Sequence, residues 1–196
     1  MRKLWLILGI MTAMALLIPA AIVFGGAADD PPGHDRRVMI FRSGGGPRLG
    51  VEIDDITSAA GPLRYLRVHG DCHAGNILWR GGAPHFVDFD DARMAPAVQD
   101  LWMMLSGERE RQTAQLAALI EGYSEFNEFN PAELRLIEPL RALRMLHYSA
   151  WLARRWEDPI FPVTFPWFNT VRYWGEHILE LREQLAALAE PPLELE

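Results

Sequence analysis

A short stretch between residues 69 and 91 gathers side chains that could transfer a phosphoryl group. Its sequence is HGDCHAGNILWRGGAPHFVDFDD, and it contains Asp71, Asn76 and Asp88. Amide and carboxylate oxygens suit Mg²⁺, which takes one or two protein ligands and leaves its other positions to water and phosphate. Asn76 and Asp88 could therefore hold the metal, while Asp71 stays available to accept a proton.

A β-hairpin is expected to bring these side chains together. Residues 77–79 and 86–87 are apolar runs, and Gly81, Gly82, Ala83 and Pro84 lie between them, a pattern typical of a hairpin turn. The two strands of a hairpin start and finish at the same end. Asn76, just before the first strand, and Asp88, just after the second, should therefore lie side by side.

The spacing of these residues matches that of protein kinases. Kinases carry H-R-D, four residues and an Asn, then a strand pair and D-F-G. Here His69, Gly70 and Asp71 precede Asn76 by the same spacing, and DFD occupies residues 88–90. The pattern resembles the aminoglycoside phosphotransferase and choline kinase-like family.

Longer strings extend this resemblance to the bacterial stress response Ser/Thr kinases of the same fold. They are RVHGDCHAGNILW, VDFDDARMAPAVQDLWMML, ARRWEDPIFPVTFPW and the closing EPPLELE. Together they cover about residues 63–196, which the resemblance identifies as a kinase-like C-terminal lobe.

The resemblance implies a role for each residue of the motif. Asp71 would be the catalytic base, and Asn76 and Asp88 would bind Mg²⁺. His69 and Asp100 would support the catalytic loop. The cofactors would be ATP and Mg²⁺, and the acceptor would be a hydroxyl group of a protein or small molecule.

Two positions depart from the kinase pattern. Gly70 replaces the Arg that pairs with a phosphorylated activation loop, and Asp90 replaces the Gly of D-F-G. Neither activation-loop switching nor a swinging D-F-G is therefore expected.

Other chemistries for the same stretch are less well supported. His69 and His73 are four residues apart, which on a helix would suggest zinc, but Gly70 and Gly75 disfavour a helix. Cys72 lies inside the motif without a base that singles it out as a nucleophile. A small buried residue is the expected role for Cys72.

Composition limits the partners. The chain has 196 residues, 49% of them hydrophobic, a formal net charge of −7 and a single cysteine. This acidic balance argues against non-specific nucleic-acid binding, which needs clustered cations. The single cysteine permits no internal disulfide.

The first 62 residues differ from the kinase-like part. Residues 1–25 contain an uncharged run from Leu4 to Phe24, long enough for a signal peptide or transmembrane anchor. Residues 26–62 have a linker composition, and RLGVEIDDI resembles the start of a truncated PDZ domain. A membrane location is expected if residues 4–24 form an anchor, and a cytoplasmic one, as in the resembling family, if they do not.

The count of lysines bears on ATP binding. Kinases anchor ATP phosphates with a lysine of the N-terminal lobe, but the only lysine is Lys3. No residue is therefore assigned to ATP binding, and the stretch between Gly25 and Pro62 is too short for an N-terminal lobe. A truncated or chimeric gene product, or a lobe completed by an N-lobe partner, would explain this.

The remaining sequence predicts helices. They are expected at residues 96–105, 112–126, 132–156 with a kink at Pro139, and 167–189, with a loop at 158–166. The predicted fold class is α+β: a mainly helical kinase-like C-terminal lobe with a catalytic-loop β-hairpin, behind an N-terminal hydrophobic helix.

Two functions follow from these patterns. The first is ATP- and Mg²⁺-dependent phosphoryl transfer to a Ser/Thr hydroxyl. The second is a non-catalytic, membrane-anchored binding module that keeps only the form of the lobe.

Overall fold

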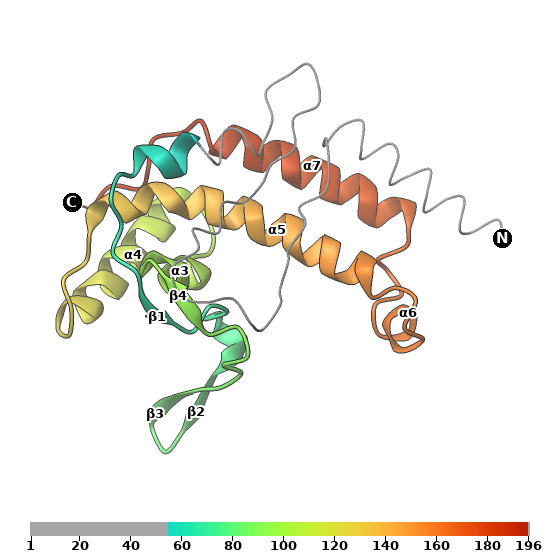
Figure 1. Cartoon of the computed structure of the whole chain (residues 1–196), viewed down its shortest axis with the longest axis horizontal. Helices are drawn as coiled ribbons and strands as arrows, with labels where there is room; N and C mark the ends of the chain where they lie inside the picture. The colour runs from blue at the N-terminus through green and yellow to red at the C-terminus, as the bar shows by residue number, and fades with distance from the viewer. Residues whose placement is uncertain (1–54, 196) are drawn as a thin grey trace, which may run out of the picture. The chain divides into compact units, whose positions relative to one another are not determined.

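The computed structural model describes residues 55–195, which from Ile56 onward form one compact unit (Figure 1). The predicted hydrophobic helix, and the linker and PDZ-like strands before residue 55, lie outside the described residues. None of the helices within 55–195 is long and apolar enough to cross a lipid bilayer. Helices combined with two small antiparallel sheets confirm the α+β character of this part.

A two-stranded sheet brackets the motif. Strand β1 (Leu66–Val68) pairs antiparallel with β4 (Arg93–Ala95), so that Leu66 faces Ala95 and Val68 faces Arg93. The sequence did not reveal this sheet, because three residues are too few to show alternation. The chain between β1 and β4, which contains the motif, therefore starts and ends at the same place in the lobe.

The predicted hairpin is confirmed. Strand β2 (Ile77–Arg80) pairs with β3 (Ala83–Phe86) through a two-residue turn at Gly81 and Gly82, whose φ angles are 62° and 80°. Positive φ at both turn residues is what a tight hairpin with twisted strands requires. The second strand begins earlier than expected and includes Pro84, which a two-stranded sheet tolerates at its edge.

The rest of the described chain is helical. The elements are the 3₁₀ helices η1 (Ala74–Asn76), η2 (Trp102–Met104) and η3 (Pro131–Leu136), and the α-helices α3 (Val98–Leu101), α4 (Arg109–Ser124), α5 (Ile137–Arg154), α6 (Ile160–Thr164) and α7 (Val171–Ala187). The predicted helix at 96–105 is divided into α3 and η2. The predicted loop at 158–166 contains the short helix α6, so that prediction was wrong in part.

Local sequence explains where the later helices begin. The Asn130 side chain accepts a hydrogen bond from the Ala132 amide at 3.1 Å, and Pro131 follows it, which caps η3. Thr170 likewise accepts from the Tyr173 amide and caps α7. Pro139 lies in the first turn of α5, where its missing N–H is tolerated. The helix predicted at 132–156 is divided into η3 and α5 between Leu136 and Ile137, and the kink at Pro139 stays a prediction.

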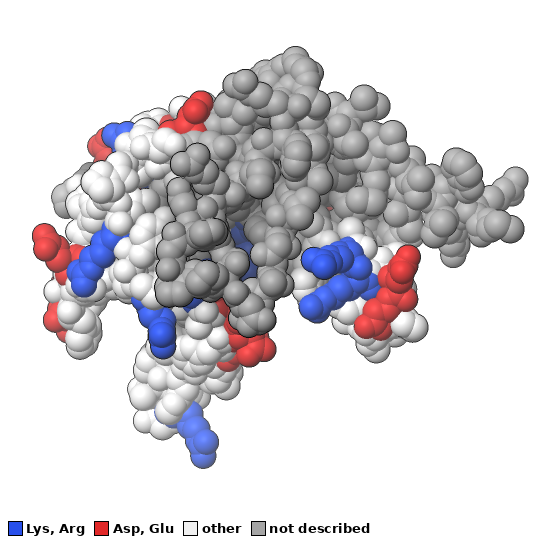
Figure 2. Space-filling model, in the orientation of Figure 1, with Lys and Arg blue, Asp and Glu red and all other residues white. Residues whose placement is uncertain are grey.

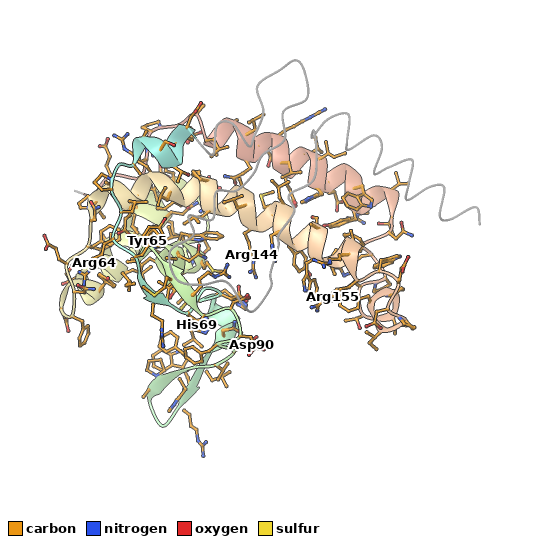
Figure 3. All side chains as sticks on the ribbon, in the orientation of Figure 1. Arg64, Tyr65, His69, Asp90, Arg144 and Arg155 are labelled. Atoms are coloured by element: carbon orange, nitrogen blue, oxygen red, sulfur yellow. The ribbon has the colours of Figure 1, made fainter. Side chains whose placement is uncertain are left out.

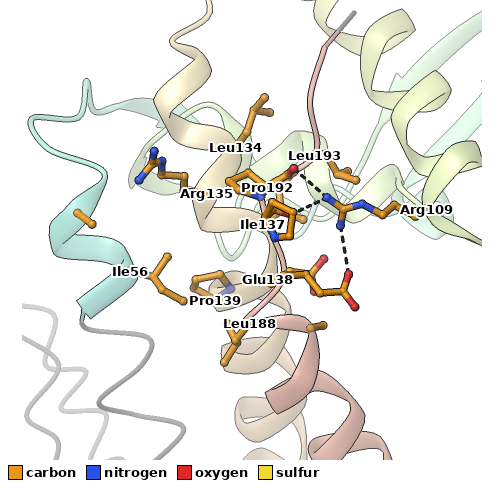
Figure 4. Close-up of a pocket in the computed structure, with 14 residues that line it drawn as sticks. Ile56, Arg109, Leu134, Arg135, Ile137, Glu138, Pro139, Leu188, Pro192 and Leu193 are labelled. Carbon is orange, nitrogen blue, oxygen red and sulfur yellow. Dashed lines mark hydrogen bonds and ion pairs between the residues drawn. The ribbon is translucent and has the colours of Figure 1, made fainter.

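The main core packs α3, α4, η3 and α5 together. Its most buried members are Val98, Leu116 and Ile137, each at most 1% exposed, and Leu193 of the C-terminal tail joins them. Arg109 fixes this tail by donating to the carbonyls of residues 191 and 192, at 2.5 and 2.8 Å (Figure 4). A cavity of about 230 Å³ opens beside the tail, and no residue of the motif lines it.

Helices α5 and α7 run antiparallel, side by side (Figure 1). A buried polar network joins them: Nε2 of His177 lies 2.8 Å from the Ser149 hydroxyl, and that hydroxyl lies 3.1 Å from the Tyr173 hydroxyl. The His177 ring stacks on Tyr173, and Nδ1 lies 3.6 Å from a carboxylate oxygen of Glu180. Burial lowers the pKa of His177, although Glu180 acts in the opposite direction.

Charges of both signs lie interspersed on the face shown in Figure 2. Arginine side chains neighbour Asp and Glu there, so the described residues of this face present no single-sign patch.

The buried state of His177 predicts that stability falls in mild acid. As the pH drops below about 6.5, the unfolded chain binds a proton that the folded chain takes up only at lower pH. The urea midpoint should therefore be lower at about pH 5.5 than at about pH 7.5, and this difference should be smaller in His177→Gln.

Part of the pH dependence of the urea midpoint should remain in His177→Gln, because burial also lowers the pKa of His147. His85→Gln, at an exposed position, is the matched control. An unchanged pH dependence in His177→Gln would contradict the prediction.

Candidate active site

The carboxylate of Asp100 holds the start of the motif. Its Oδ2 accepts a hydrogen bond from the His69 amide at 2.7 Å, and its Oδ1 accepts one from the Gly70 amide at 2.9 Å. Asp100 lies on α3, so the two bonds attach the loop to the helical core. Charged acceptors make such bonds short and strong. The expected supporting position of Asp100 is confirmed.

The His69 ring connects the loop to the residue before Asp88. Its Nδ1 accepts from the Asp71 amide at 3.3 Å, which leaves Nε2–H to donate to the Val87 carbonyl at 2.8 Å. The ring is 7% exposed, and its centroid lies 4.6 Å from that of Phe89. His69 therefore supports the loop, as expected.

Asn76 is held between the loop and the hairpin. Its Nδ2 donates to the Asp71 carbonyl at 3.0 Å, and its own carbonyl accepts from the Val87 amide at 3.0 Å. With the amide nitrogen used in this way, Oδ1 is the atom left for a cation. The backbone bond to Val87 brings Asn76 beside the position from which Asp88 follows.

Asp88 turns the chain at the end of the hairpin. It adopts φ 64°, and among the described residues no other non-glycine has a positive φ. Aspartate tolerates this left-handed conformation better than most residues. Its side chain is exposed, so it is open to a ligand.

Zinc is not supported by the histidines of the motif. Both ring nitrogens of His69 are engaged by backbone groups, and Nδ1 of His73 accepts from the Gly75 amide. In residues 55–195 no cluster of three or more His, Cys, Asp or Glu could hold a metal. The predicted magnesium ligands, Asn76 and Asp88, are one amide and one carboxylate, so the absence of such a cluster does not bear on them.

The side chain of Asp71 is 15% exposed and faces two basic residues. Its Oδ1 lies 2.7 Å from Nη1 of Arg144, and its Oδ2 lies 3.6 Å from Nε2 of His73. Arg144 belongs to α5 and was missed by the sequence analysis. No local pattern reveals a partner so distant in the sequence.

Cys72 is buried beside this network. Burial, reinforced by the carboxylates of Asp100 and Asp71, raises the pKa of its thiol to about 11. The thiolate is the nucleophilic form, so Cys72 is poorly suited to attack a substrate, in agreement with its expected role as a small buried residue.

Comparison with known proteins agrees with this geometry. Residues 34–137 match the phosphotransferase enzyme family. The chain belongs to this family. The match begins before residue 63, and the predicted division at residue 62 stays a prediction.

Individual relatives in the family are bacterial kinases. The chain is 59% identical over 130 residues to stress response kinase A of Escherichia coli K12, and 58% identical over the same length to serine/threonine protein kinase RdoA of Salmonella typhimurium LT2. Each match covers 66% of this chain and 39% of the relative. The chain therefore spans about two fifths of the length of these phosphotransferases.

Substitution of Gly70 would test how closely the loop approaches the chain after Asp88. This glycine has φ +86°, and a Cβ there would lie 2.1 Å from the Asp91 carbonyl oxygen. Gly81, with φ +62° and no atom within 4 Å of such a Cβ, is the matched control. We expect Gly81→Ala to cost about 1 kcal/mol and Gly70→Ala a further ~1–3 kcal/mol in urea unfolding. Equal losses would contradict the clash.

Cys72 gives a second prediction. Because it is the single cysteine, iodoacetamide labelling followed by mass spectrometry reports on this thiol alone. Native protein should react far more slowly than urea-unfolded protein, since the raised pKa reduces the thiolate fraction roughly a hundredfold at neutral pH. The native rate should keep rising above about pH 9. Rapid labelling of the native protein at neutral pH would contradict both the burial and the raised pKa.

Proposed function

We propose that the chain is the C-terminal lobe of an ATP- and Mg²⁺-dependent phosphotransferase that acts on a Ser/Thr hydroxyl. The observation that carries this proposal is the hydrogen-bonded frame that joins the loop of Asp71 to Asn76 and to the residue before Asp88. One relative is named as a serine/threonine protein kinase, which supports the choice of acceptor. A small-molecule hydroxyl is the alternative acceptor.

In this proposal, Asp71 is the catalytic base. The acceptor oxygen forms a bond to the γ-phosphorus of ATP, the bond from that phosphorus to the bridging oxygen breaks, and ADP leaves. The hydroxyl proton passes to the Asp71 carboxylate. Asp71 is suited to this role because its backbone is held on both sides, by His69 and by Asn76, and a positioned backbone reduces the search for a reactive geometry.

The donors present at the proposed metal position fit Mg²⁺. They are Oδ1 of Asn76 and the exposed carboxylate of Asp88, both hard oxygen ligands. When bound, the metal would neutralise charge on the ATP phosphates. The chain's own contribution is to keep these two side chains at one end of the hairpin.

ATP binding would need a second lobe. Residues 55–195 contain no lysine, so the phosphate anchor would come from a partner or from the remainder of a longer protein. The hairpin presents exposed apolar side chains, among them Leu78 at 53%, Trp79 at 74% and Phe86 at 48%. Such a surface would suit a covering N-terminal lobe. Use of ATP favours the cytoplasm, with membrane attachment through residues 4–24 as the alternative.

The second candidate function is a non-catalytic binding module. The absence of an anchoring lysine from this sequence favours it. Binding of Mg-ATP separates the two candidates.

The test supplies the chain with a lysine-bearing N-terminal lobe and combines calorimetry with phosphate transfer from labelled ATP to a protein acceptor. Asp71→Asn should lower transfer by about 10²–10⁴-fold and leave Mg-ATP binding intact, because it removes the base and not the metal ligand. Asp88→Asn should weaken Mg-ATP binding itself. Glu176→Gln, exposed on α7, is the control and should change neither.

Two results would count against the proposal. Transfer that persists in Asp71→Asn would exclude Asp71 as the base. Failure of the unaltered chain to bind Mg-ATP when a lysine-bearing N-terminal lobe is supplied would favour the binding module.

A further inference from the structure

Arg144 of helix α5, outside the motif, places a positive charge beside the proposed base. Nη1 of Arg144 lies 2.7 Å from Oδ1 of Asp71, and the Arg144 side chain is 38% exposed against 15% for Asp71. The labelled side chain of Arg144 extends from α5 toward the loop (Figure 3). Neither the kinase spacing nor the proposed metal ligands involve this residue.

The contact is ionic and is not an aligned hydrogen bond. Oδ1 of Asp71 is buried and has no hydrogen-bond partner among the described residues, although the guanidinium lies beside it. The other oxygen, Oδ2, lies 3.6 Å from Nε2 of His73, whose side chain is 42% exposed. The two oxygens therefore differ: Oδ1 faces α5, and Oδ2 faces the more exposed histidine.

The rest of the frame fixes the Asp71 backbone and leaves its side chain to be fixed otherwise. The amide of Asp71 donates to His69, and its carbonyl accepts from Asn76. Neither bond restricts rotation about the two side-chain torsions of aspartate, which have several low-energy settings. The contacts that the described residues make to the carboxylate itself come from Arg144 and His73.

We propose that Arg144 is a positioning residue of the transfer site: it holds Oδ1 of Asp71 so that Oδ2 is presented to the acceptor hydroxyl. This inference rests on the proposed function, since it assigns a purpose to the base. Because Arg144 is 38% exposed and Asp71 is 15% exposed, the pair contributes a modest, measurable amount to stability, and the main effect of Arg144 is on the geometry of the base.

The kinetic test compares variants of Arg144 in the full chain, supplied with the lysine-bearing N-terminal lobe. Arg144→Gln should lower kcat about tenfold, a part of what a general base contributes, with little change in the KM for ATP. Arg144→Lys should retain more activity because it keeps the charge, and millimolar guanidinium should partly restore Arg144→Ala. Arg172→Gln is the control, since Arg172 pairs with Glu176 on the exposed side of α7.

Three kinetic results would overturn the inference. They are equal losses in Arg144→Gln and Arg172→Gln, a rise in acceptor KM with kcat unchanged, and failure of both lysine and guanidinium to restore activity. A merely structural role for Arg144 would give no rescue by free guanidinium.

A second measurement needs no activity. Urea midpoints of Asp71→Asn, Arg144→Gln and the double variant form a cycle. If Arg144 holds Asp71, Arg144→Gln should shift the midpoint less when Asp71 is already Asn. Additive shifts would overturn the pairing. Absence of transfer by the unaltered chain with the N-terminal lobe supplied would instead overturn the proposed function, and the cycle would still decide whether Arg144 and Asp71 interact.

Discussion

The lobe depends on one buried relay of hydrogen bonds. Glu133, 2% exposed, accepts from the Val98 amide at 3.0 Å and so fixes the start of α3. Two residues further on, Asp100 accepts from the amides of His69 and Gly70. His69 in turn reaches the carbonyl of Val87. Burial raises the pKa of Glu133, because the core disfavours the charged form of this carboxyl group. These bonds fix the loop at His69 and the chain at Val87 relative to the helical core.

Local chemistry made part of this arrangement predictable. Two glycines between apolar runs specify a tight turn, and the turn alone brings Asn76 beside Val87. The supporting positions of His69 and Asp100 followed from the family spacing. The sheet of β1 and β4 was not predictable, since its pairs are set by the tertiary fold and not by local alternation. Glu133 lies at the start of the helix predicted at 132–156, and nothing local in the sequence indicates that its carboxylate accepts from the amide of a different helix.

Aromatic packing explains why the expected loop at 158–166 contains a helix. Phe161 of α6 lies against Trp151 of α5, with ring centroids 5.1 Å apart, and Arg155 lies 4.9 Å from the Trp151 ring centroid. These contacts belong to a cluster that also contains Leu152 and Phe168, and they supply the burial that a five-residue helix cannot supply by propensity. Proline and aromatic composition signalled irregular chain, but the aromatic side chains were also the source of the packing.

The lobe separates a rigid frame from open ligand positions. His69 and Asn76 are 7% and 9% exposed, and both ring nitrogens of His69 and Nδ2 of Asn76 are engaged with backbone groups. Oδ1 of Asn76 and the exposed Asp88 are the positions left open. Every bond of the frame comes from residues 69–133, so the lobe holds its own geometry. What the described residues lack is a lysine for phosphate, and its absence leaves that frame unchanged. An intact frame and a missing phosphate anchor are therefore compatible: the first depends on contacts within this lobe, and the second is the contribution expected of another lobe.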